Sequence, residues 1–102
     1  MLFVATHSHT PESCFADDPT PVHQLASAEH AKECGVKVVG SYIAAPEHRF
    51  YFVLEAQEYS SVVRFFRPVM TRGIHDITPV QTLADSLGIF PVQRQRRTRR
   101  QA

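Results

Sequence analysis

Residues 36–55 read VKVVGSYIAAPEHRFYFVLE, and this stretch decides the fold. Residues 36–44 and 49–55 are rich in β-branched and aromatic side chains, which favour strands. Residues 45–48 have proline at the second position and polar residues after it, as is typical of a type I turn. The stretch therefore predicts two antiparallel strands joined as a hairpin.

An amphipathic helix is predicted on either side of this hairpin. Upstream, apolar residues recur at helical spacing over residues 22–34, with Thr20 as the N-cap and Gly35 suited to the C-terminal cap. Downstream, residues 58–70 carry apolar side chains at i, i+3, i+4 and i+7. Pro68 should end or kink that second helix, because proline lacks the amide hydrogen and clashes with the preceding turn.

Two further strands are predicted outside these helices. Residues 2–7 form a short apolar run, and residues 74–83 alternate well enough for a strand, with Pro79 indicating an edge or a bulge. The order strand, helix, strand, strand, helix, strand is that of the ferredoxin-like βαββαβ fold. We therefore expect an α+β domain with a four-stranded antiparallel sheet and both helices on one face.

The hairpin strands are apolar on both of their faces. Strict alternation would place Val36, Val38 and Tyr42 on one face, and Val39 and Ile43 on the other. Two helices can cover only one face, and a solvated second face would carry polar residues. We expect a second copy of the chain to cover that face, so the protein is predicted to be a homodimer.

This element order, the doubly apolar sheet and the chain length resemble the dimeric α/β-barrel superfamily over about residues 1–85. The resemblance implies that two such sheets pack into one barrel. That superfamily includes small cofactor-free monooxygenases, lactone isomerases, haem-handling enzymes and stress-responsive modules. It also includes small nickel-binding proteins with a histidine near the end of the first strand, a position similar to that of His7.

The stretch His7-Ser8-His9-Thr10-Pro11-Glu12-Ser13-Cys14 concentrates metal-binding side chains at the end of the first predicted strand. His7 and His9 are two residues apart, so both leave the same face of a strand, about 6–7 Å apart. Further ligands would complete a metal site with a position open to water or a small-molecule substrate. Imidazole and thiolate together suit zinc, nickel, copper or iron. The predicted metal ligands are His7, His9, Glu12, Cys14 and His48, with His75 as a further candidate.

Other interpretations of these residues stay open. His7 or His9 could be a general base in a cofactor-free monooxygenase or isomerase, with the apolar sheet face as its pocket. Cys14 could be a nucleophile whose thiolate those histidines stabilise. The same residues could instead be turn and strand-end residues of a module that only dimerises or responds to stress. Metal binding is the first prediction, and whether the protein is an enzyme is left open.

Composition and charge indicate a single-domain protein and argue against nucleic-acid binding and membrane insertion. The 102 residues predict one domain over residues 1–88, followed by a basic, disordered tail at 89–102. Before residue 93 the chain has 6 basic and 10 acidic residues, so nucleic-acid binding is not expected. No run approaches the roughly 20 apolar residues of a membrane span, and no secretory segment is evident. We therefore expect a cytoplasmic protein with Cys14 and Cys34 reduced.

Overall fold

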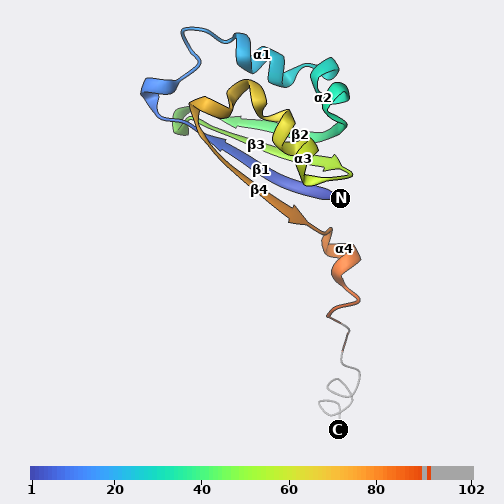
Figure 1. Ribbon diagram of the computed structural model, residues 1–102. Coiled ribbons are helices and arrows are strands. Elements are labelled where there is room, and N and C mark those ends of the chain that lie inside the picture. Colours follow the sequence, from blue (N-terminus) through green and yellow to red (C-terminus); the bar gives the residue numbers. More distant parts are fainter. Residues whose placement is uncertain (91, 93–102) are drawn as a thin grey trace.

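Four antiparallel strands form one open sheet in the order β2-β3-β1-β4 (Figure 1). Their bounds are β1 Leu2–Ser8, β2 Val36–Ala44, β3 Arg49–Ala56 and β4 Ile74–Val80. The computed structural model describes residues 1–90 and 92. β1 and β3 are central, and the strand order and connections are consistent with the ferredoxin-like arrangement. The predicted α+β class with a four-stranded antiparallel sheet is confirmed.

Helices cover one face of this sheet (Figure 1). They are α1 Thr20–Ala26, α2 Ala28–Cys34 and α3 Tyr59–Phe65, and a 3₁₀ segment at Arg67–Arg72 follows α3. A fourth short helix, α4 Leu83–Ser86, lies beyond the end of β4, away from α1 and α2. Within the described residues, no helix has both the length and the apolar character that a bilayer crossing requires.

Alternate side chains of the two central strands point toward the helices and form the core. Each core side chain is at most 6% exposed, and burial of one phenylalanine contributes roughly 1.5–3 kcal/mol. His7 is among them and is fully buried, so one end of this otherwise apolar core is polar. These core residues are Phe3, Ala5, His7, Phe50, Phe52 and Leu54 from the strands, and Val62, Phe65, Phe66 and Val69 from α3 and the segment after it.

The helix predicted over residues 22–34 is in fact two helices, because Ser27 interrupts it. Ser27 has an extended backbone (φ −74°, ψ 142°), and its hydroxyl accepts a hydrogen bond from the His30 amide at 3.1 Å. A serine that caps the second helix in this way also stops the first. The helical spacing of apolar residues continues through the break, so the sequence pattern predicted a single helix. Gly35 ends α2 in the left-handed conformation (φ 73°), as predicted.

Strict alternation along β2 is also wrong, because the strand contains a bulge. The register against β3 shifts between Val38 and Gly40, so Val39 has no direct partner. Ile43 consequently lies opposite Phe50 on the helix-covered face, and Tyr42 lies opposite Tyr51 on the open face. The extra residue exchanges the faces that alternation assigned to these two side chains.

Pro68 and Thr82 account for the ends of α3 and β4. α3 stops at Phe65, before Pro68, as predicted. β4 stops at Val80 rather than at residue 83, because the Thr82 hydroxyl accepts from the Asp85 amide at 3.1 Å and starts α4. Pro79 lies on an edge strand, as predicted. The predicted tail at 89–102 lies outside the described residues, except for 89, 90 and 92.

Candidate metal centre

Histidines from separate parts of the chain form a continuous row at the polar end of the core. His7 on β1 lies directly opposite His75 on β4, and its Nδ1 is 2.8 Å from Nε2 of His75. Nε2 of His7 is 3.0 Å from Nδ1 of His9. The ring of His9 meets that of His48 edge to face, with centroids 5.2 Å apart. Four imidazoles thus run across one end of the sheet.

The backbone of the strand ends brings His9 and His48 together. The His9 amide donates to the His48 carbonyl at 3.1 Å, which continues the pairing of β1 with β3 past the end of β1. His48 closes the 3₁₀ turn Ala45–Glu47 and has a left-handed backbone, with φ 54°. A residue other than glycine seldom adopts this conformation, and such positions cluster at functional sites.

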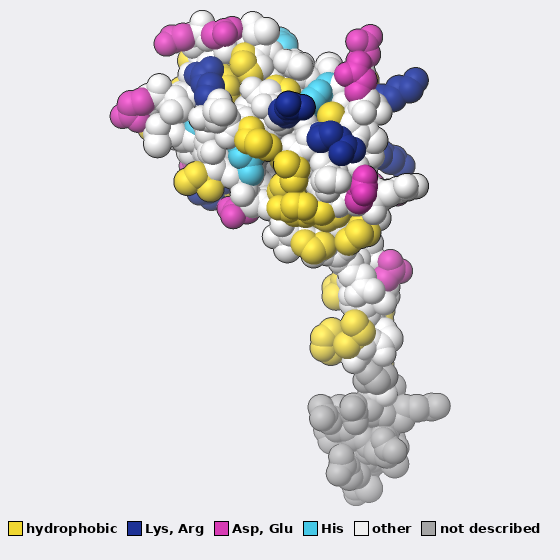
Figure 2. Space-filling view, in the orientation of Figure 1, with side chains coloured by type: hydrophobic (Ala, Val, Ile, Leu, Met, Phe, Trp, Pro, Cys, Tyr) yellow, Lys and Arg dark blue, Asp and Glu magenta, His cyan; other side chains and the backbone are white. Residues whose placement is uncertain are grey.

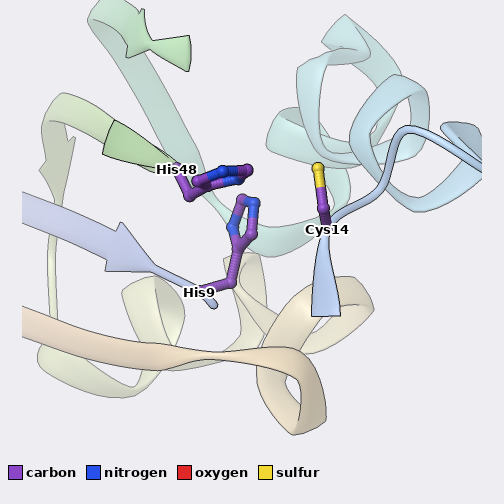
Figure 3. A group of neighbouring side chains, drawn as sticks. All are labelled: His9, Cys14 and His48. Carbon is purple, nitrogen blue, oxygen red and sulfur yellow. The ribbon is translucent and has the colours of Figure 1, made fainter. Parts of the chain in front are cut away.

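Cys14 completes a group of three possible ligands with His9 and His48 (Figure 3). One donor atom from each lies within 4.8 Å of the others, and all three residues are half-buried. Donors around one tetrahedral zinc ion are roughly 3.3–3.8 Å apart, given metal–ligand bonds of 2.0–2.3 Å. Small side-chain rotations would therefore place these three donors on one ion. Because Nδ1 of His9 faces His7, Nε2 is its free nitrogen.

His7 stands behind this group and holds His9 in place. Both of its ring nitrogens are hydrogen-bonded, and its ring stacks on Phe50 with centroids 5.1 Å apart. A neutral imidazole has one N–H, so a metal on Nε2 of His9 would leave the proton on Nδ1, which donates to His7. His7 would then donate from Nδ1 to His75. Metal-bound histidines are commonly oriented by such a second hydrogen bond.

The electrostatics of the row favour neutral imidazoles. Burial lowers the pKa of His7 to about 4, with smaller contributions from His75 and His9. Burial also lowers the pKa of His9, and electrostatic interactions with His48 and Arg72 act in the same direction. The pKa of His75 is lowered by burial, although Asp76 opposes this. Metal ligation requires the neutral form of imidazole, so these residues do not need to lose a proton at neutral pH.

Arg72 fixes the loop that carries Cys14. Its Nη2 donates to the carbonyl oxygens of Ser13 and Cys14, at 2.9 and 2.8 Å. Its guanidinium carbon lies 4.1 Å from the centre of the Phe15 ring, which is buried against His7 and His9. Nothing in the sequence connects Arg72 with this loop, because 58 residues separate it from Cys14.

Gly73 lets the chain pass close to His7. A Cβ atom at this position would lie 2.6 Å from the Ser8 carbonyl oxygen and closer still to the His7 ring. The backbone of Gly73 is extended (φ 172°), so the need for glycine is one of space and not of conformation. Its lack of a side chain leaves room for the buried imidazole.

The structure brings together three of the five predicted ligands. Donor atoms of His9, Cys14 and His48 lie within 4.8 Å of one another, whereas both ring nitrogens of His7 are already hydrogen-bonded. Glu12 is exposed on the 3₁₀ turn Pro11–Ser13 and is not a member of the group. A scan against protein-family models and a search of curated proteins found no match to this chain.

The free energy of unfolding should fall as the pH drops below about 6.5, because folded His7 resists protonation. Its pKa is about 4 when folded and 6.5 when unfolded, so the unfolded chain binds more protons between these values. The loss should approach about 3 kcal/mol toward pH 4. Urea unfolding from pH 7.5 to 4.5 measures it. His7→Gln should flatten most of this dependence, and the exposed His23→Gln should not. A wild-type stability that is constant over this range would contradict the prediction.

Gly73→Ala should destabilise the protein, because the added methyl group collides with His7 and Ser8. Overpacking of this kind costs about 1–3 kcal/mol, which corresponds to a Tm lower by roughly 5–15 °C in a domain of this size. Thermal unfolding followed by circular dichroism tests this. Gly88→Ala is the matched control, since a Cβ there would meet nothing within 4 Å. Equal Tm values for the two variants would refute the steric argument.

Proposed function

We propose that this protein binds a transition metal ion through His9, Cys14 and His48 and works as a homodimer. The observation that supports the metal site most directly is the approach of three soft or borderline donors within 4.8 Å of one another. The three come from the end of β1, the following loop and the β2–β3 hairpin, and each is separately anchored. Such anchoring favours a site that exists before the metal arrives.

The donor set selects the class of metal. Two imidazole nitrogens and one thiolate suit zinc and copper, and also nickel or iron, whereas magnesium and calcium prefer oxygen ligands. One thiolate with two imidazoles is the donor set of trigonal copper sites, and mixed thiolate and imidazole sets also hold zinc. By the general order of affinities, copper should bind more tightly than zinc, nickel or iron.

Three protein ligands leave a fourth position open at the ion. The ligands are half-buried, so this position is open to water or to a small molecule. A metal ion bound there could be transferred to another protein site, or it could polarise a bound water or a carbonyl oxygen. We therefore propose metal handling or metal-assisted chemistry on a small molecule as the role of the site.

The open face of the sheet supports the homodimer. It carries a band of apolar side chains, some strongly exposed, such as Tyr42 at 64% and Ile74 at 72%. A band of this kind on a sheet without covering helices is typical of a surface that binds a partner. Arg49 and Glu55 lie on the same face with opposite charges, which a two-fold arrangement can pair. The band comprises Leu2, Val4, Tyr42, Tyr51, Val53, Ile74 and Val80.

Replacement of any one ligand should weaken metal binding by about 100-fold or more. Calorimetric titration of tag-free protein with Zn²⁺ would compare His9→Ala, Cys14→Ser and His48→Ala with the wild type. His7→Gln should cost about 10-fold, because it removes only the hydrogen bond that orients His9. With Co²⁺, the thiolate-to-metal absorption band should appear in the wild type and be lost in Cys14→Ser.

His30 and Cys34 provide the matched control. Their side chains are 3.9–4.0 Å apart, but no third ligand joins them among the described residues. His30→Ala and Cys34→Ser should therefore leave Zn²⁺ affinity unchanged. If the wild type binds Zn²⁺ and Cu²⁺ no better than a variant that lacks all three ligands, the metal-binding function is wrong.

A charge in the open sheet face should dissociate the homodimer. Val53→Asp places a carboxylate in the centre of the apolar band, where pairing with a second copy would bury it at a cost of several kcal/mol. Sedimentation equilibrium at micromolar concentration should report a dimer for the wild type and a monomer for Val53→Asp. Tyr59→Asp, at an exposed position on α3, is the control that should stay dimeric. A monomeric wild type would overturn the homodimer.

A further inference from the structure

The segment after β4 presents apolar side chains that nothing among the described residues covers. We call residues 82–90 the arm; it contains α4 and extends away from the sheet (Figure 1). Leu83, Leu87 and Phe90 are 77%, 59% and 71% exposed, and they are spaced as on one face of a helix. Hydrophobic side chains stand out along this part of the molecule in Figure 2. Exposed apolar side chains this dense mark a binding surface.

Local hydrogen bonds give the arm a defined shape. The Ile89 amide donates to the Ser86 carbonyl at 2.9 Å, and the Phe90 amide donates to the Leu87 carbonyl at 3.1 Å. The Thr82 hydroxyl caps α4. A helix of four residues is nevertheless too short to persist alone in water. A stable α4 therefore needs a surface that receives its apolar side chains.

The body of the molecule has a groove of matching chemistry. A cavity of about 690 Å³ lies between the helices α1 and α2 and the edge strand β2. Its walls are apolar, including Leu25, Val38 and Ile43, and Ile43 is itself 64% exposed. The two charged residues that line it, Lys32 and Lys37, are both basic.

Charge and position both pair this groove with the arm. Asp85 is the arm's only charged residue, and it is opposite in sign to Lys32 and Lys37. The arm leaves from β4 and the groove adjoins β2, which are opposite edges of the sheet. Because α4 points away from α1 and α2, the arm of one copy is directed outward and not toward its own groove.

We infer that the arm of one copy docks into the groove between α1, α2 and β2 of a second copy. Leu83, Leu87 and Phe90 fill the apolar cavity, and Asp85 lies beside Lys32 and Lys37 at its rim. This exchange involves no metal ligand, and it shares only Lys37 and Tyr42 with the open sheet face. Val53→Asp, which lies outside the groove, therefore separates the two modes of association. The exchange can thus hold or fail independently of the proposed function.

A peptide of residues 81–90 tests the groove directly. Full-length Leu87→Asp/Phe90→Asp has a defective arm and a free groove, so it should bind this peptide in fluorescence anisotropy. Ile43→Asp, added to that protein, should weaken binding by more than about 10-fold. Lys32→Glu with Lys37→Glu reverses the charge at the rim and should weaken peptide binding by about two- to fivefold, as for exposed ion pairs. The peptide with Asp85→Lys should then bind the reversed groove better than the native peptide does. Absence of peptide binding would overturn the inference.

Mixing two variants decides whether docking is between copies. Both variants carry Val53→Asp, so that association through the sheet face is removed. One also carries Leu87→Asp/Phe90→Asp, and the other Ile43→Asp with Lys32→Glu and Lys37→Glu. Exchange between copies predicts a heterodimer in sedimentation when the two are mixed and none when each is alone. An absence of heterodimer would show that the arm docks within its own chain or elsewhere, and would refute the exchange.

Discussion

The hydrogen-bonded row from His75 through His7 to His9 is the interaction on which the site depends. It places a fully buried imidazole in the core, where an unpaired polar group would cost about 1–3 kcal/mol. Both nitrogens of His7 are satisfied, and each partner is held by a different strand or strand end. Gly73 gives the ring room and Phe50 gives it a stacking surface. The orientation of His9 is thereby fixed from inside the protein, and Nε2 is left as its free nitrogen.

Elements whose signals are local were predictable from the sequence. The hairpin, the outer strands and the two helical regions follow from periodicity, and Gly35 and Pro68 mark the ends of helices where the structure has them. The break at Ser27 was not predicted, because the helical spacing of the apolar residues continues through it. The bulge at Val39 has no reliable signal, since it depends on how β2 registers against β3.

The site was predictable only as a set of candidate side chains. The His-x-His spacing placed the rings of His7 and His9 next to each other, but it could not tell which of the two joins Cys14 and His48. That distinction depends on His75, which is 68 residues from His7. The position of Cys14 depends on Arg72, and contacts across such separations leave no pattern in one sequence. Exposure of Glu12 follows from the turn that carries it.

The hydrogen bonds from Arg72 to the loop that carries Cys14 affect the order in which the site can form during folding. Arg72, Gly73 and His75 lie in one short stretch late in the chain, yet all three contact the first fifteen residues. During synthesis, Cys14 and His9 leave the ribosome long before residues 72–75 have been made. A nascent chain that ends before this stretch therefore lacks both Arg72 and His75. The proposed metal site therefore forms only with the finished sheet, so a truncated chain has the candidate ligands without their arrangement.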